Sequence, residues 1–124
     1  RVLISSIDEK LSLKILLCGQ EKLSHTLKRS SHADLLHRIN LQFCLRPMSR
    51  DKTCAYIDYR IKKADGQIKI FEPAAKELIH DYTGGVPRQV NNVATACLLS
   101  AAARGVKIIT EALVNETMSE FHLP

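Results

Sequence analysis

The sequence predicts a mostly α-helical protein with a short β portion near its start. Its residues are 45% hydrophobic but only 5% aromatic, with no Trp, so the core must be built from aliphatic side chains, which favours helices. From residue 49 onward, apolar residues recur with helical spacing between recognisable start and stop signals. Before that point, two short apolar runs have the pattern of strands.

The first of these runs, residues 13–18, is nearly continuously apolar and ends at Gly19. This pattern is typical of a strand that is buried on both faces of a parallel sheet. Residues 21–29 are polar apart from two leucines four positions apart, and they predict a short amphipathic helix. One or two further helical turns are expected within residues 33–39.

A second strand is expected at residues 40–45, where apolar and polar residues alternate until Pro47 stops the pattern. Two strands cannot form a stable sheet alone. The first third of the chain therefore requires sheet partners. Because the sequence starts at Arg1 without an initiator Met, we expect the chain to be part of a longer protein.

Four helices are expected in the remainder of the chain. Ser49 is a favourable N-cap with an acidic residue in the turn that follows, and Gly66 ends the first helix. Pro73 opens the second helix, and the Gly84-Gly85 pair terminates it. The expected inner faces of these two helices consist of Cys54, Ile57, Ile61, Ala75, Leu78, Ile79 and Tyr82.

The third helix is expected to begin at Pro87 and to end at Gly105. Residues 107–109 are expected to be extended, and Thr110 is expected to cap the fourth helix. The expected inner faces of these two helices consist of Val90, Val93, Ala94, Cys97, Leu98, Ala101, Leu113, Val114, Thr117, Met118 and Phe121.

The length of 124 residues suits one domain with its own core, or a small domain joined to a piece of another. The expected elements favour the second arrangement. Residues 1–48 are interpreted as a piece of a larger α/β unit, and residues 49–124 as a four-helix domain.

The charge limits the classes of partner. The chain carries 18 basic and 13 acidic residues, a formal net charge of +5. Such an excess either attracts nucleic acid, nucleotides or anionic surfaces, or is the solvated exterior of an ordinary domain. The basic residues are scattered apart from Lys62-Lys63, so no basic stripe supports nucleic-acid binding, which stays an open alternative. No apolar stretch approaches the roughly 20 residues of a membrane span and no signal peptide is recognised, so we expect a cytoplasmic location.

The four cysteines lie far apart in apolar settings, contain no C-x-x-C pair and show no ligand spacing with the histidines. We therefore expect buried, reduced thiols and no metal site. These cysteines are Cys18, Cys44, Cys54 and Cys97.

The sequence lacks the motifs of a self-sufficient nucleotide hydrolase. It contains no G-x-x-x-x-G-K-S/T phosphate loop and no apolar strand that ends in Asp-Glu. A nucleophile elbow and an H-E-x-x-H helix are absent as well. Catalysis by this chain alone is therefore not expected.

The segment G-G-V-P-R at residues 84–88 carries the most specific chemistry. Its glycines and proline place Arg88 in the first turn of a long helix, where free N–H groups and the positive end of the helix dipole already favour anions. A guanidinium at this position can approach a polyphosphate with fork geometry. A helix–turn–helix corner whose arginine faces solvent is the alternative explanation, and the residues alone leave both open.

This segment resembles the lid of AAA+ ATPases, in which G-G/A-x-P-R carries the sensor 2 arginine. More narrowly, the chain resembles ATPases of the general secretion pathway protein A (ExeA-like) type and their transposition-associated relatives, which carry G-G-I-P-R-x-I-N-N. Residues 15–23, I-L-L-C-G-Q-E-K-L, are similar to the family's I-x-L-V-G-Q-P-E-L, with Glu21 in place of proline. L-H-R-I at residues 36–39 resembles the family segment that ends in R-I, and L-R-P-M-S-R at residues 45–50 resembles the family motif of the same letters.

The resemblance implies a role for each matching position. Arg88 matches the sensor 2 arginine, which contacts the nucleotide phosphates. Gln20 matches the sensor 1 position, whose polar side chain orients the attacking water; the alternative is that Gln20 caps the following helix. Arg38 matches an arginine finger that completes a neighbouring subunit's site, and a local salt bridge with Asp34 is its alternative.

Pro47 and Ile57 match the hinge and the first lid helix, which border the adenine in this family; Ile57 is alternatively a core residue of the lid. The resemblance thus implies the C-terminal part of a AAA+ ATPase, in which residues 1–48 end the nucleotide-binding core and residues 49–124 form the lid. ATP and Mg2+ are expected to bind the intact parent, and neither is expected to remain bound to this piece alone.

The implied function of the parent is the coupling of ATP binding and hydrolysis to movements of the lid and of the subunits. Its implied partners are further copies of the AAA+ module and proteins of a secretion machinery, with attachment of the parent to the cytoplasmic membrane left open. Two other functions stay open: a transposition-type ATPase that acts on DNA, and a nucleotide-independent interaction module.

Overall fold

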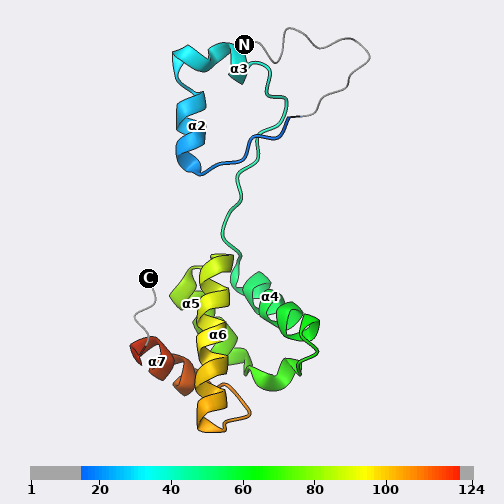
Figure 1. The fold of residues 1–124 in the computed structure, drawn as a ribbon, viewed down its shortest axis with the longest axis vertical. Helices are drawn as coiled ribbons and strands as arrows, with labels where there is room; N and C mark the ends of the chain where they lie inside the picture. Colours follow the sequence, from blue (N-terminus) through cyan, green and yellow to red (C-terminus); the bar gives the residue numbers. More distant parts are fainter. Residues whose placement is uncertain (1–14, 121–124) are drawn as a thin grey trace. The chain divides into compact units, whose positions relative to one another are not determined.

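The computed structural model describes residues 15–120, and this part of the chain is mostly helical. It contains six α-helices and two short 3-10 helices, and no strand is present between residues 15 and 120. The chain divides into two compact units, residues 1–44 and residues 45–124, which we describe one at a time (Figure 1). The prediction of a mostly helical protein is confirmed.

The described part of the first unit consists of short helices. Helix α2 spans Glu21–Leu27, a 3-10 helix spans Ser30–His32, and α3 spans Ala33–Leu36. The helical segments expected after Gly19 are therefore confirmed. Neither α-helix contains a buried residue, so the first unit has no developed core among its described residues.

The strands expected in this region are not formed. Of the first, residues 13–14 lie outside the described range, whereas residues 15–18 and the whole of residues 40–45 are irregular. The apolar side chains of the second segment are exposed, with Leu41 at 85% and Phe43 at 84%. A strand pattern specifies which face would be buried, but the backbone N–H and C=O groups still need a neighbouring strand. The strand predictions are therefore wrong for the described residues.

The second unit contains the four expected helices. Helix α4 spans Arg50–Lys63, α5 spans Pro73–Thr83, α6 spans Pro87–Arg104 and α7 spans Glu111–Glu120 (Figure 1). The ends of α5 and α6 follow the sequence signals closely, whereas α4 ends at Lys63, before the expected Gly66. Proline is the first residue of α5 and of α6, and the glycines that end these helices are left-handed, with φ of 56° at Gly84 and 66° at Gly105.

The core of the second unit lies where α5 contacts α4, α6 and α7. Two of its residues come from the connecting segments, since Phe71 is 2% exposed and Ile109 is fully buried. These residues form a parallel β-bridge, in which the Ile109 N–H donates to the Ile70 carbonyl over 2.7 Å and the Glu72 N–H donates to the Ile109 carbonyl over 3.0 Å. The other members of the core are Ile57, Ala75, Ile79, Val90, Val93, Cys97, Ala101, Leu113 and Val114.

Three buried threonines replace apolar residues on the inner faces. Thr53, Thr83 and Thr117 each donate a hydrogen bond to the carbonyl four residues earlier, over 3.0, 2.7 and 2.7 Å. Because the hydroxyl is satisfied within its own helix, its burial costs little. The predicted inward position of Tyr82 is wrong: its ring is 46% exposed and its hydroxyl donates to Asn115 Oδ1 over 2.7 Å at the edge of the unit.

The four cysteines have different surroundings. Cys97 is fully buried and Cys54 is half-buried, whereas Cys18 and Cys44 are exposed, so the expectation of four buried thiols is wrong for the last two. Burial raises the pKa of the Cys97 thiol, and a hydrogen bond with Thr117 offsets part of this rise. Cys18 and Cys44 lie in the two segments that were expected to be strands, and these segments would be buried only within a sheet.

Between residues 15 and 120, no helix has the length and apolarity that crossing a membrane requires.

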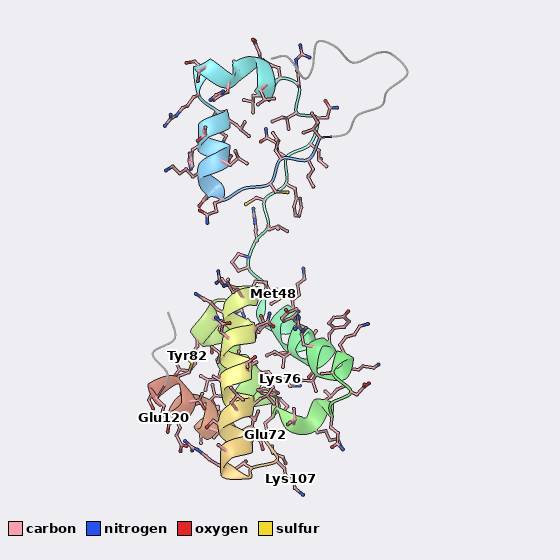
Figure 2. The ribbon with its side chains drawn as sticks, viewed as in Figure 1. Met48, Glu72, Lys76, Tyr82, Lys107 and Glu120 are labelled. Atoms are coloured by element: carbon pink, nitrogen blue, oxygen red, sulfur yellow. The ribbon has the colours of Figure 1, made fainter. Side chains whose placement is uncertain are left out.

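A nearly buried ion pair joins α4 to α5. Lys76 Nζ lies 2.5 Å from Asp58 Oδ1, and the Lys76 side chain is only 9% exposed, against 32% for Asp58. Figure 2 labels Lys76 within the second unit. Asp58→Ala should destabilise the chain by about 1–3 kcal/mol, because it leaves a poorly solvated ammonium without its partner. Urea unfolding followed by circular dichroism measures this change in the free energy of unfolding.

Lys76→Met is the matched control, since it removes the charge and keeps the apolar stem. It should cost less than Asp58→Ala, and the double variant should recover part of the loss caused by Asp58→Ala. Equal costs for the two single variants would contradict this account of the pair.

Candidate functional site

The L-R-P-M-S-R and G-G-V-P-R segments meet in the second unit. The Met48 N–H donates to the Gly85 carbonyl over 2.9 Å, which joins the residues before α4 to the turn between α5 and α6. Gly85 has φ of 73°, and a Cβ on it would lie 2.0 Å from the Met48 carbonyl oxygen. Only glycine permits both the conformation and this close approach. We call the contact of Met48 with the Gly84-Gly85 turn the corner.

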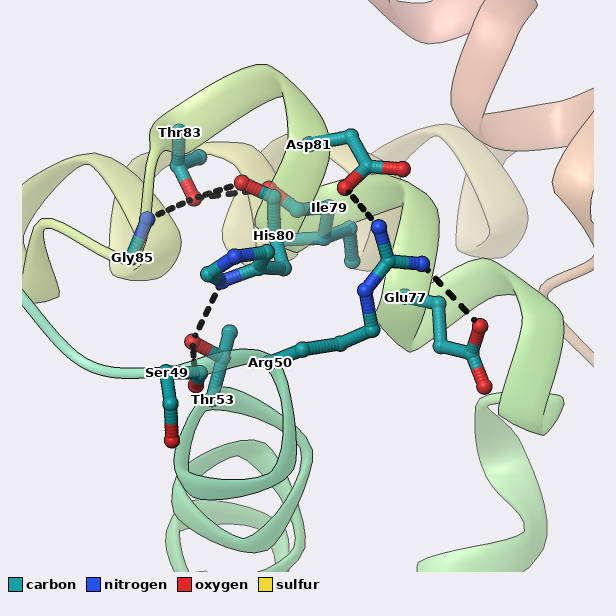
Figure 3. Close-up of polar contacts among 9 residues, drawn as sticks. All are labelled: Ser49, Arg50, Thr53, Glu77, Ile79, His80, Asp81, Thr83 and Gly85. Atoms are coloured by element: carbon teal, nitrogen blue, oxygen red, sulfur yellow. Dashed lines mark hydrogen bonds and ion pairs between the residues drawn. The ribbon is translucent and has the colours of Figure 1, made fainter.

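The turn itself is fixed by Thr83. Its hydroxyl donates to the Ile79 carbonyl over 2.7 Å and accepts the Gly85 N–H over 3.4 Å. The Val86 N–H donates to the Thr83 carbonyl over 3.1 Å, so the chain leaves α5 and enters α6 along a defined path. Figure 3 shows Thr83 between α5 and Gly85.

The first turn of α6 presents Arg88 to solvent. Val86 is the N-cap, and its side chain makes no capping hydrogen bond. Pro87 has no N–H, and Arg88 directly after it is exposed. The N-terminus of an 18-residue helix therefore has no side-chain cap of its own next to an exposed guanidinium. This combination suits an anionic group, for which it offers backbone N–H donors and a fixed cation.

Arg50 holds the first turn of α4 on the last turns of α5. Its two terminal nitrogens bind different carboxylates, Nη1 at 3.2 Å from Glu77 Oε2 and Nη2 at 2.6 Å from Asp81 Oδ1 (Figure 3). Glu77 and Asp81 are four residues apart and so lie on one face of the helix. The hydrogen bond that Arg50 donates to Glu77 and the charge of Asp81 raise the pKa of the Arg50 guanidinium.

A second link between α4 and α5 involves Thr53 and His80. The Thr53 hydroxyl donates to the Ser49 carbonyl over 3.0 Å and lies 3.0 Å from His80 Nδ1 (Figure 3). Which of the two groups donates in the contact between Thr53 and His80 depends on the imidazole tautomer.

A groove of about 160 Å³ lies between α4 and α6. The Tyr56 hydroxyl donates to Asn91 Oδ1 over 3.1 Å across it, and both residues line it together with Ile57 and Arg60. Asn91 is three residues after Arg88, so both belong to one side of α6. The groove wall is otherwise mainly apolar.

The structure brings together only some of the predicted site residues. Pro47 is exposed directly before Met48, and Arg88 is exposed three residues after Gly85, so both flank the corner. Ile57 is 2% exposed and is a member of the core, although it also lines the groove.

Gln20 and Arg38 belong to the first unit. Gln20 is exposed at the N-cap of α2 and accepts the Leu23 N–H on its carbonyl over 2.8 Å, but its side chain makes no capping bond. Arg38 is exposed after α3, and its N–H donates to the Leu35 carbonyl over 3.0 Å.

Sequence reasoning missed the residues that support the corner, namely Arg50, Thr53 and His80. One signal was available for Arg50. Glu77 and Asp81 stand four apart on the expected second helix, and a pair of carboxylates at this spacing calls for a cation from a neighbouring element. Over the described range, no group of three His, Cys, Asp or Glu side chains is placed to hold a metal ion.

Comparison with known proteins gives a partial match for this chain. Over 98 residues it is 35% identical to General secretion pathway protein A of Aeromonas hydrophila. The match covers 79% of this chain and 18% of that protein, so the chain is a partial homologue that spans less than a fifth of its relative's length. The resemblance stated from the motifs is thereby confirmed. No family model and no solved structure matches the chain.

Proposed function

We propose that this chain is the C-terminal part of a AAA+ ATPase module, with residues 1–48 at the end of the nucleotide-binding core and residues 49–124 as its helical lid. In the intact protein the lid would cover bound ATP and Mg2+, and its movement would follow nucleotide binding and hydrolysis. The partial homology with General secretion pathway protein A supports this proposal and favours a role in secretion.

The observation that carries the proposal is the placement of Arg88. It is exposed in the first turn of α6, next to helix N–H groups that no side chain caps, and the corner holds this turn against the residues that enter the lid. Such a turn binds phosphate oxygens well, because backbone donors and a guanidinium act on the same charge. Arg88 is therefore proposed to contact the nucleotide phosphates from the lid.

The remaining roles follow from position in the proposed module. Gln20 would orient the attacking water from the core, and Arg38 would reach the nucleotide of a neighbouring subunit. Pro47 would border the adenine at the entrance to the lid. Ile57 is a buried core residue, so it would support the residues around the adenine rather than contact the base over a large area.

Mg2+ bound with ATP in the intact protein would supply positive charge that offsets the negative charge developing during phosphoryl transfer. This chain's own contribution is the lid cation at Arg88 and the rigid support of that cation. A protein of this class works as an assembly, so self-association of the module and contacts with a secretion machinery are proposed for the intact protein, at the cytoplasmic side of the membrane.

The test uses the complete reading frame that contains this chain, beside the 124-residue chain alone. The complete product should hydrolyse ATP with Mg2+. The chain alone should show no turnover, and calorimetric titration should give no micromolar dissociation constant, because the backbone amides and lysine of a phosphate loop supply most phosphate contacts. A micromolar constant for the chain alone would overturn the proposed division of labour. A complete product that binds partners and never hydrolyses ATP would be an interaction module, and turnover stimulated mainly by DNA would indicate a transposition-type ATPase.

A further inference from the structure

Three links join the first residues of the second unit to the end of α5. They are the Met48–Gly85 backbone bond, the fork of Arg50 on Glu77 and Asp81, and the Thr53–His80 hydrogen bond. All three fall within six residues on the α4 side and within nine residues on the α5 side (residues 48–53 and 77–85). Figure 3 shows the last two links side by side on the same face of α5.

We propose that Arg50 is a positioning residue for Arg88. By holding the first turn of α4 on the end of α5, it fixes the Met48–Gly85 contact, and through that contact it fixes the first turn of α6 relative to the chain that enters the lid. This inference rests on the proposed role of Arg88 at the nucleotide.

The fork geometry explains how the Arg50 side chain can stabilise the Met48–Gly85 contact. A single backbone hydrogen bond such as Met48–Gly85 contributes only a small net free energy to stability. Arg50 is anchored at two points one helical turn apart, so the two contacts together resist sliding of α4 along α5 more than a single contact would. A lysine carries the same charge on one nitrogen and cannot reproduce this restraint.

The second unit contains a matched control. Arg104 makes the same kind of fork, with Nη1 on Glu116 and Nη2 on Glu120, the latter at 2.9 Å, and so joins α6 to α7. Its side chain is 38% exposed, against 49% for Arg50. Arg104 ends α6, whereas the corner and Arg88 lie at the start of that helix.

The first test measures hydrogen exchange of single amides by NMR in the 124-residue chain. Arg50→Ala should raise the exchange rate of the Met48 amide about threefold or more relative to the amides of Val93 and Cys97, which report the core. Arg50→Lys should raise it as well, because the fork is lost. Arg104→Ala should leave the Met48 amide unchanged relative to the same core amides.

An unchanged Met48 rate in Arg50→Ala, or an equal rise in Arg104→Ala, would overturn the inference. A wild-type exchange rate of the Met48 amide in Arg50→Lys would show that the positive charge alone stabilises the Met48–Gly85 contact. The fork geometry would then have no part in the inference. These results do not depend on ATP, so they hold whether or not the proposed function does.

The second test measures ATP turnover in the complete product. Arg50→Ala should lower kcat/KM several-fold with the core intact, whereas Arg104→Ala should leave it unchanged. If Arg88→Ala impairs turnover and Arg50→Ala does not, the positioning role is wrong. If neither affects turnover, the proposed contact of Arg88 with the nucleotide fails, while the effect on Met48 exchange stands.

Discussion

Gly85→Ala should destabilise the 124-residue chain by about 1.5–3.5 kcal/mol. The left-handed conformation of Gly85, with φ of 73°, costs a residue with a Cβ about 1–2 kcal/mol. The new Cβ would lie 2.0 Å from the Met48 carbonyl oxygen, so the backbone must move and the Met48–Gly85 hydrogen bond is lost or distorted. This loss adds about 0.5–1.5 kcal/mol. Urea unfolding followed by circular dichroism gives the difference.

The neighbouring glycine is the control for this change. Gly84 is also left-handed, with φ of 56°, but a Cβ there would meet nothing within 4 Å. Gly84→Ala should therefore cost only the conformational part, about 1–2 kcal/mol. Equal effects of the two substitutions would show that the close approach to Met48 does not restrict residue 85.

Arg88→Ala should slow the nucleotide-linked step of the complete ATPase by about ten- to a hundredfold, the size of a lost charge-assisted hydrogen bond. The second unit should stay folded, because Arg88 is exposed and its removal leaves Val90, Val93 and Cys97 in place. Steady-state turnover measures the effect, and thermal unfolding of the same variant excludes a change of fold. Unchanged turnover would contradict the proposed phosphate contact.

Mixing experiments distinguish Arg88 from Arg38. Subunits with Arg38→Ala keep their own nucleotide pocket, so mixing them with subunits defective in the phosphate loop should restore some hydrolysis at mixed interfaces. The same mixing with Arg88→Ala should restore little, because Arg88 is proposed to serve its own subunit's pocket. Identical behaviour of the two variants would remove the basis for assigning them to different sites.

The helices of the second unit could be predicted because their ends are determined locally. Pro73 and Pro87 fix the backbone at first-turn positions, and Gly84 and Gly105 take up left-handed conformations that terminate α5 and α6. A proline or glycine acts through its own backbone, so its effect is readable without knowledge of the partners. The same is true of Thr110, whose hydroxyl accepts the Leu113 N–H over 3.4 Å.

The features that escaped prediction depend on neighbours far along the chain. Phe71 and Ile109 lie in short connections with no periodicity, and only their mutual bridge explains why both are buried. The fork of Arg50 requires α4 and α5 to pack at one particular register. The expected strands failed for the converse reason, since residues 40–45 carry the pattern but no paired strand accompanies them between residues 15 and 120.

For the candidate site, the motif predicted where Arg88 stands but not what supports it. The exposed first turn of α6 follows directly from G-G-V-P-R. Glycine is needed at residue 85 for two reasons, the left-handed backbone of the turn and the close approach of Met48. The sequence indicated only the turn. The second reason, the Met48 carbonyl, belongs to the other motif and becomes visible only when the two segments are placed together.

The bridge between Phe71 and Ile109 has a consequence for the cooperativity of unfolding. It ties the connection between α4 and α5 to the connection between α6 and α7, over a separation of 38 positions in the sequence. If α7 detached, Ile109 would lose its cover, and the Glu72 and Ile109 backbone bonds would open at the start of α5. Helix α7 therefore cannot detach without weakening the connection between α4 and α5. We expect α4 to α7 to unfold as one cooperative unit rather than helix by helix.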